Sequence, residues 1–159
     1  MKILLPNEVV LELNENSTVL NAALAISEGL ARNAVAGKVN GELVDLSHVL
    51  KDGDALQVIT MRDKEGLEIY RHTCSHVLAQ AIKTIFPTSC LAIGPVVENG
   101  FYYDIDFKTP ITQEDLSKIE DEMQKIIKGD LPIERFTLPY KEAVKLMKGF
   151  KEPYKVQLI

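Results

Sequence analysis

The sequence has no tryptophan, only 2 cysteines and 3 histidines, and no long run of apolar residues. Cys74 and Cys90 are too few for a disulfide framework, and their presence fits a reducing compartment. No stretch approaches the roughly 20 apolar residues of a membrane span. Pro6, Asn7 and Glu8 interrupt the apolar start that a signal peptide would need. We therefore expect a cytoplasmic protein that makes no membrane contact.

The sequence also has fewer basic than acidic residues. With 18 Lys and Arg against 23 Asp and Glu, the formal net charge is −5, which gives no long-range attraction for a polyanion. Contacts with nucleic acid would therefore be local, or would depend on parts of a larger protein. The 46% hydrophobic and 26% charged residues are typical of a folded protein, and 159 residues suffice for one ordinary domain or two small ones.

The first sixty residues predict a small sheet wrapped around one helix. The predicted strands are, in order, Met1–Leu5, Val9–Leu13, Val35–Val39, Leu43–Leu46 and Ala55–Thr60. Ser17 and Thr18 can cap the helix, and Gly29 is placed to end it. Asn40 and Gly41 tolerate positive φ and predict a tight hairpin. The order β-β-α-β-β-β indicates a ubiquitin-like β-grasp fold.

A polar segment, Met61–Gly66, predicts a domain boundary, with the β-grasp at residues 1–62 and a second domain at residues 63–159. The second domain should begin with the helix Leu67–Phe86, which Pro87 stops. The later elements are the hairpin strands Leu91–Val97 and Phe101–Phe107, the helix Thr112–Lys128, the strand Ile133–Leu138, the helix Tyr140–Lys148 and the strand Tyr154–Ile159. The whole is therefore predicted to be α+β. Its close on an apolar strand without a turn or polar tail favours a domain truncated on the C-terminal side.

Two of these elements also predict which side chains are buried. Along Phe101–Phe107 aromatic and aliphatic residues alternate with polar ones, the pattern of a half-buried strand. In the helix that follows, Thr112 and Asp115 form a capping box. The expected buried stripe of that helix is Leu116, Ile119, Met123, Ile126 and Ile127.

His72 and His76 are the side chains most able to carry chemistry. Residues four apart in a helix lie about 40° apart around its axis, so both imidazoles share one face. The core stripe of the helix lies roughly opposite and runs through Cys74, Leu78, Ala81, Ile82 and Ile85. The histidine pair, with Ala79 and Lys83 beside it, therefore faces either solvent or a cleft lined by another element.

Three interpretations of the histidine pair stay open at this point. The two imidazoles can be surface groups on a solvated face. They can bind zinc, but a zinc ion needs further ligands, and Cys74, Cys90 and His48 are badly placed to supply them. They can also position and polarise a water molecule beside an ester.

Two nearby features have plainer structural explanations. Gly94 and Pro95 predict a bend in a strand, because no glycine-rich cradle accompanies them as it would in a phosphate loop. Lys83 lies close to the histidine face, where we expect an ordinary solvated helix lysine.

The segments RHTCSHVLAQAIKTIFP (Arg71–Pro87) and AIGPVVENGFYYDID (Ala92–Asp106) closely resemble bacterial threonyl-tRNA synthetases. The similarity continues through Ile111–Leu116 to Glu152–Ile159, and the first segment of the chain resembles the TGS domain that opens those enzymes. The resemblance implies that residues 63–159 are the N-terminal part of an editing domain that hydrolyses mischarged seryl-tRNA(Thr). Editing is needed because one missing methyl changes binding by only about 1–3 kcal/mol, so a synthetic site admits serine.

By the same resemblance, His72 and His76 match the editing histidines, while Tyr103 and Lys155 match positions that line the editing cleft. The histidines would orient the attacking water, Lys155 would hold the substrate or a bound water, and Tyr103 would shape the pocket. In the family a downstream Cys-x-x-x-His element completes the site, and this sequence contains none. We therefore expect little or no editing by this chain alone.

The resemblance further implies a class II, ATP-dependent threonine–tRNA ligase as the whole enzyme. Its catalytic core would bind ATP, Mg and Zn, whereas we expect no metal or cofactor on the residues present here. The implied partners are tRNA(Thr) and seryl-tRNA(Thr), and the whole enzyme would be a homodimer through that core. This chain alone should have no ligase activity.

Two other functions remain as alternatives. One is a related editing deacylase of the alanyl-tRNA type, which shares the HxxxH-containing domain and binds zinc. The other is a TGS-bearing module that docks RNA or a protein and catalyses nothing. A hydrolytic site predicts imidazoles that face a cleft, whereas a docking module predicts imidazoles that lie loose on the surface.

Overall fold

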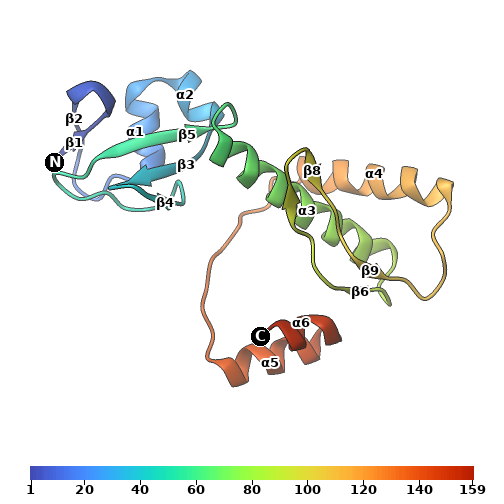
Figure 1. Cartoon of the computed structure of the whole chain (residues 1–159). Helices are drawn as coiled ribbons and strands as arrows, with labels where there is room; N and C mark the ends of the chain where they lie inside the picture. Colours follow the sequence, from blue (N-terminus) through green and yellow to red (C-terminus); the bar gives the residue numbers. More distant parts are fainter. The chain divides into compact units, whose positions relative to one another are not determined.

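The computed structural model describes residues 1–159, apart from the side chain of Asn7. The chain divides into two compact units, Met1–Tyr70 (unit 1) and Arg71–Ile159 (unit 2). Both units combine helices with short antiparallel strands, which confirms the predicted α+β class (Figure 1). None of the helices that the structure describes is long and apolar enough to cross a membrane.

Unit 1 is built on a three-stranded antiparallel sheet. The central strand β3 (Ala34–Val39) pairs with β4 (Glu42–Val44) on one side and with β5 (Leu56–Thr60) on the other. A second ladder joins β1 (Lys2–Leu4) to β2 (Val10–Glu12) across the short 3-10 turn η1 (Pro6–Glu8). The helices α1 (Val19–Ile26) and α2 (Glu28–Asn33) lie between the two ladders in sequence. Their shared core consists of Ile3, Val19, Ala22, Val39, Leu50 and Leu56.

Local sequence signals explain most boundaries in unit 1. Thr18 caps α1 in a capping box with Asn21, which confirms the predicted start of the helix. Asn40 and Gly41 adopt φ of 51° and 90°, as the predicted hairpin requires. The prediction that Gly29 ends the helix is wrong. Ser27 ends α1 in an extended conformation, and its hydroxyl then accepts a hydrogen bond from the Leu30 N–H to cap α2.

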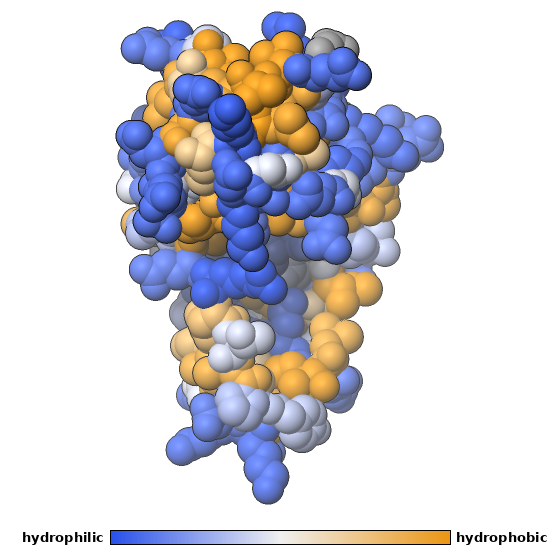
Figure 2. Space-filling view, turned by 90° about the vertical axis from the view of Figure 1, so that its left-hand side faces the viewer, coloured by the Kyte–Doolittle hydropathy of each residue, from blue (hydrophilic) through white to orange (hydrophobic). Residues whose placement is uncertain are grey.

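Hydrophobic side chains also reach the surface of the molecule, where Figure 2 shows them in orange. In unit 1 they include Val9, Val10 and Leu24, each about half exposed. Scattered apolar groups of this kind are normal on a folded protein and by themselves indicate no binding site.

Unit 2 forms around the helix α3 (Lys64–Ile85), which starts in unit 1 and supplies its later turns to unit 2. The helix α4 (Gln113–Lys128) packs against it, and the core joins the two helices to β6 (Cys90–Leu91). That core consists of Ala79, Ala81, Ile82, Leu91 and Ile119. The capping box of Thr112 with Asp115 is present, as predicted.

The hairpin after α3 is more broken than the sequence predicts. Two short ladders replace two continuous strands, with β6 pairing β9 (Ile105–Asp106) and β7 (Val96–Val97) pairing β8 (Gly100–Phe101). The interruption falls at Gly94-Pro95, where proline has no N–H to donate to a ladder. The predicted alternation from Phe101 to Phe107 is confirmed, because the polar members are exposed and the others are half-buried.

Predictions for the last thirty residues are partly wrong. The helix α5 (Tyr140–Gly149) is present as predicted. The expected strand Ile133–Leu138 instead lies in residues 131–139, all of them described, which form neither helix nor strand. Ile133 is 87% exposed, so its apolar character does not reflect burial in this chain.

The expected strand Tyr154–Ile159 is the helix α6 (Pro153–Leu158). Pro153 stands in its first turn, where the fixed φ of proline suits a helix and its missing N–H leaves no bond unmade. The Val156 N–H donates to the Glu152 carbonyl at 3.2 Å and closes that turn.

The buried stripe of α4 is also narrower than predicted. Ile119 is buried, with Met123 and Ile126 packed against the same core. Leu116 and Ile127 are exposed, so these two assignments are wrong. They lie at the margins of the stripe, which a single packing partner does not cover.

Candidate functional site

Two histidines from α3 form the centre of the candidate site. The rings of His72 and His76 stack with their centroids 4.7 Å apart and an angle of 21° between their planes. Both side chains are exposed, on the face that the helical spacing predicts. Between them along the chain, the buried Ser75 turns the other way and donates its hydroxyl proton to the His72 carbonyl at 2.8 Å.

Tyr103 and Lys155 come together from two other parts of unit 2. Tyr103 lies between β8 and β9, and Lys155 lies on α6. The Lys155 Nζ donates to the Tyr103 hydroxyl at 3.3 Å and lies 5.7 Å from the centre of the tyrosine ring. A lysine ammonium at this distance is attracted by the ring, so the contact is both a hydrogen bond and a cation–π pair.

The charge of Lys155 also reaches His76. Partial burial, followed by the positive charges of His72 and Lys155, holds the pKa of His76 below its ordinary value of 6.5. His76 is therefore largely neutral near pH 7, and a neutral imidazole can accept a proton. Of the four residues that sequence reasoning singled out, the structure pairs His72 with His76 and Tyr103 with Lys155, and the charge of Lys155 acts on His76.

Gly94 sets how closely the chain approaches Tyr103. A Cβ atom added at Gly94 would lie 2.3 Å from Cδ2 of the Tyr103 ring, which is far inside van der Waals contact. Glycine is therefore needed here to admit the ring. The bend predicted at Gly94-Pro95 correctly describes the backbone, but nothing in the sequence links it to Tyr103.

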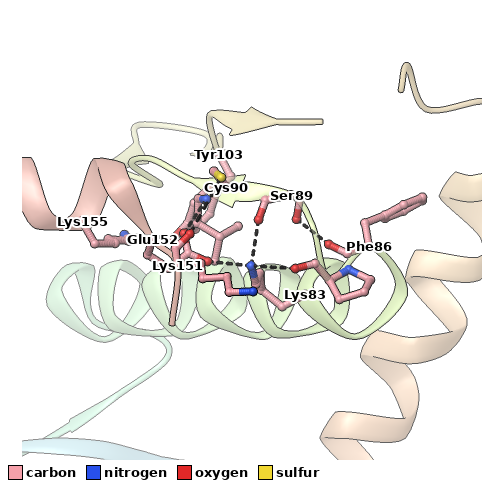
Figure 3. A network of polar contacts seen from close by, with 10 residues as sticks. Lys83, Phe86, Ser89, Cys90, Tyr103, Lys151, Glu152 and Lys155 are labelled. Atoms are coloured by element: carbon pink, nitrogen blue, oxygen red, sulfur yellow. Dashed lines mark hydrogen bonds and ion pairs between the residues drawn. The ribbon is translucent and has the colours of Figure 1, made fainter. Parts of the chain in front are cut away.

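Sequence reasoning missed Glu152, the residue that immediately precedes α6. Its side chain is almost completely buried, and its Oε1 lies 2.7 Å from the Lys83 Nζ (Figure 3). Its Oε2 accepts a hydrogen bond from the Leu91 N–H at 2.9 Å. A carboxylate followed by proline carries no signal of burial, because the partner lysine is remote in sequence.

The expectation that Lys83 is an ordinary solvated lysine is wrong. Besides its ion pair with Glu152, the Lys83 Nζ donates to the carbonyl oxygens of Ser89 at 2.7 Å and Pro87 at 3.3 Å. Its charge is therefore used inside unit 2, between α3 and the segments that follow it.

Among the described side chains, no group of three or more His, Cys, Asp and Glu residues is placed to hold a metal ion. Cys74 and Cys90 are both free thiols and half-buried. The Cys90 Sγ lies 4.0 Å from the Lys151 carbonyl, on the side of β6 that faces the start of α6.

Comparison with known proteins agrees with the resemblance noted above. Residues 1–60 match the TGS domain family. The whole chain is 54% identical over 159 residues to the threonine–tRNA ligase of Acetivibrio thermocellus and 52% identical to that of Clostridioides difficile. It is 48% identical over 157 residues to the threonine–tRNA ligase of Hahella chejuensis.

These matches include 99–100% of this chain but 25% of each relative, so the chain spans about a quarter of the length of the proteins it resembles. The predicted resemblance to threonyl-tRNA synthetases is therefore confirmed: with a TGS domain at residues 1–60, the chain is similar from end to end to a segment of threonine–tRNA ligases.

Proposed function

We propose that this chain is part of a threonine–tRNA ligase and that its unit 2 contributes to the hydrolysis of seryl-tRNA(Thr). One observation carries the proposal: His76, which stacks on His72, is within reach of the charge of a lysine that is hydrogen-bonded to a tyrosine. The relatives are named as threonine–tRNA ligases, and an enzyme that must distinguish threonine from serine needs a second, hydrolytic site.

In the proposed reaction, neutral His76 accepts a proton from a water molecule as the water oxygen bonds to the ester carbonyl carbon. The bond between that carbon and the ribose oxygen then breaks, and the proton passes to the departing ribose hydroxyl. The products are serine and uncharged tRNA. His72 orients the water, and the Lys155 ammonium stabilises negative charge on the carbonyl oxygen. Tyr103 keeps the ammonium in place through the contact at 3.3 Å.

Charging of tRNA with threonine would belong to residues outside this sequence, together with ATP, Mg and Zn. We propose that tRNA(Thr) is the shared partner and that the whole enzyme works as a class II homodimer. The chain alone should then neither charge tRNA nor edit efficiently.

The test uses the Acetivibrio thermocellus enzyme with these 159 residues in place of its matching segment, which is 54% identical. We expect this chimera to hydrolyse seryl-tRNA(Thr). His76→Ala should slow hydrolysis at least about 100-fold, because it removes the proton acceptor. Lys155→Ala and Tyr103→Phe should slow it less, and threonine charging should remain unchanged.

A matched control is His48→Ala, which removes the histidine of unit 1. It should leave deacylation unchanged. Hydrolysis of seryl-tRNA(Thr) at the same rate in the His72→Ala, His76→Ala and unmodified chimeras would remove the hydrolytic proposal and favour the docking module.

A further inference from the structure

We infer that the ion pair between Lys83 and the buried Glu152 fixes α6 in register along α3, so that both residues are positioning residues for Lys155. The inference rests on the proposed function, because it concerns the same site. It assigns a role to two side chains that the hydrolytic reaction itself does not use.

Glu152 anchors the start of α6 to two different elements. One carboxylate oxygen pairs with Lys83 of α3 at 2.7 Å, and the other accepts from the Leu91 N–H of β6 at 2.9 Å. Glu152 is 6% exposed, whereas the Tyr154 hydroxyl meets the Asp106 carboxylate at 3.2 Å in an exposed contact. Glu152 therefore supplies a buried attachment of α6, and Figure 3 shows its contact with Lys83.

Helical spacing then connects this anchor to the site. Lys155 follows Glu152 by three residues, within one turn of α6. On α3, Lys83 follows His76 by seven residues, which places the two about 20° apart around the helix axis. The same face of α3 therefore holds Glu152 at one end and carries the histidines at the other, so a shift of α6 along α3 would move Lys155 relative to His76.

The chemistry of the anchor makes its position specific. A buried carboxylate requires partners for both oxygens. The loss of one partner leaves an unpaired charge away from water, which destabilises the folded state. An apolar contact would tolerate sliding by a fraction of a turn, because dispersion is not directional. An ion pair combined with a backbone hydrogen bond holds one arrangement.

The test reads the position of Lys155 through His76, by nuclear magnetic resonance titration of the 159-residue chain. Burial is the largest cause of the lowered pKa of His76, followed by the charges of His72 and Lys155, so Lys155→Met should raise that pKa part of the way towards 6.5. Glu152→Gln keeps an oxygen for the Leu91 N–H but loses the ion pair. We expect it to raise the pKa of His76 as well, and Lys155→Met should add little in that background.

Three further variants make the test decisive. Lys83→Arg keeps the charge and should keep the pKa of His76 low. The double variant Lys83→Met/Glu152→Gln removes both charges of the pair, so neither is left without a partner. If Glu152→Gln alone does not fold, the pKa of His76 is measured in this double variant instead. Lys125→Gln is the control, because it breaks the exposed pair with Glu122 on α4 and should leave the pKa of His76 unchanged.

A role in stability alone predicts something different. The variants would then lower the melting temperature while the pKa of His76 in the folded chain stayed low, and that result would overturn the inference. Because the titration uses no tRNA, its outcome is independent of deacylation by the chimera. A raised pKa together with an inactive chimera would contradict the proposed function and leave the positioning role standing.

Discussion

At the scale of single residues, Gly94 is the most exacting position near the candidate site. Gly94→Ala should displace the Tyr103 ring, because the added Cβ would lie 2.3 Å from it. We expect the contact between Tyr103 and Lys155 to weaken and deacylation by the chimera to fall by a factor on the order of 10 to 100. Gly100→Ala is the matched control, since a Cβ there meets open space. Equal rates for the two variants would show that the ring position does not matter.

The same scale shows which site residues a sequence can reveal. The shared face of His72 and His76 follows from helical spacing alone. Tyr103 and Lys155 emerged only from resemblance, because no local pattern connects a strand tyrosine with a lysine far along the chain. Glu152 escaped both approaches, since its burial depends on a tertiary pairing with Lys83.

At the scale of elements, helices with strong end signals were predictable and short ones were not. The box of Thr112 with Asp115 satisfies backbone N–H groups locally, so α4 begins where the sequence says it should. In contrast, α6 has only six residues, which are too few to show the periodic spacing of apolar residues that identifies a helix. The apolar residues of this segment are equally compatible with a strand. The residue that precedes this helix, Glu152, is anchored to Leu91 of β6, a partner that is remote in sequence.

Helix α5 carries a further signal that the net charge conceals. Lys141, Lys145 and Lys148 are exposed and lie within about 60° of one another around the helix. Replacing all three by Gln should weaken tRNA binding by the chimera, and it should lower the slope of log K against log salt by about 2 to 3. Filter binding at several salt concentrations measures both quantities.

The control for α5 lies on α4. Lys118 and Lys125 are also exposed, but each is paired at 3.0 Å with an acidic neighbour, Asp115 or Glu122. Their replacement by Gln should change the salt slope little. If both sets of variants lower affinity equally, the effect reflects overall charge and α5 has no special role in binding.

At the scale of the whole molecule, the two units have separate hydrophobic cores. The buried core residues of unit 1 lie between Ile3 and Ile59, and those of unit 2 lie between Ala79 and Ile119. We therefore expect residues 1–70 to unfold cooperatively when produced alone. In that segment Leu56→Ala should lower the free energy of unfolding by about 2–5 kcal/mol, whereas Leu24→Ala, at an exposed position, should have little effect.

Urea titration followed by circular dichroism makes this measurement. An unfolded 1–70 segment would show that its core is insufficient alone, as is common for small domains. The predicted boundary lies between residues 62 and 63, ahead of the expected helix, whereas the division between the two units falls inside α3, after Tyr70.

The stretch of residues 131–139, which lies in neither helix nor strand, connects α4 to α5 and α6 within unit 2. If Glu152 determines where α6 settles, this stretch serves only as a tether. The entropy of closing a flexible loop rises by only about 0.6 kcal/mol for each doubling of its length. We therefore expect the length of the tether to vary among related proteins with little effect on the proposed editing. The residues that hold the start of α6, Lys83 and Glu152, should vary much less.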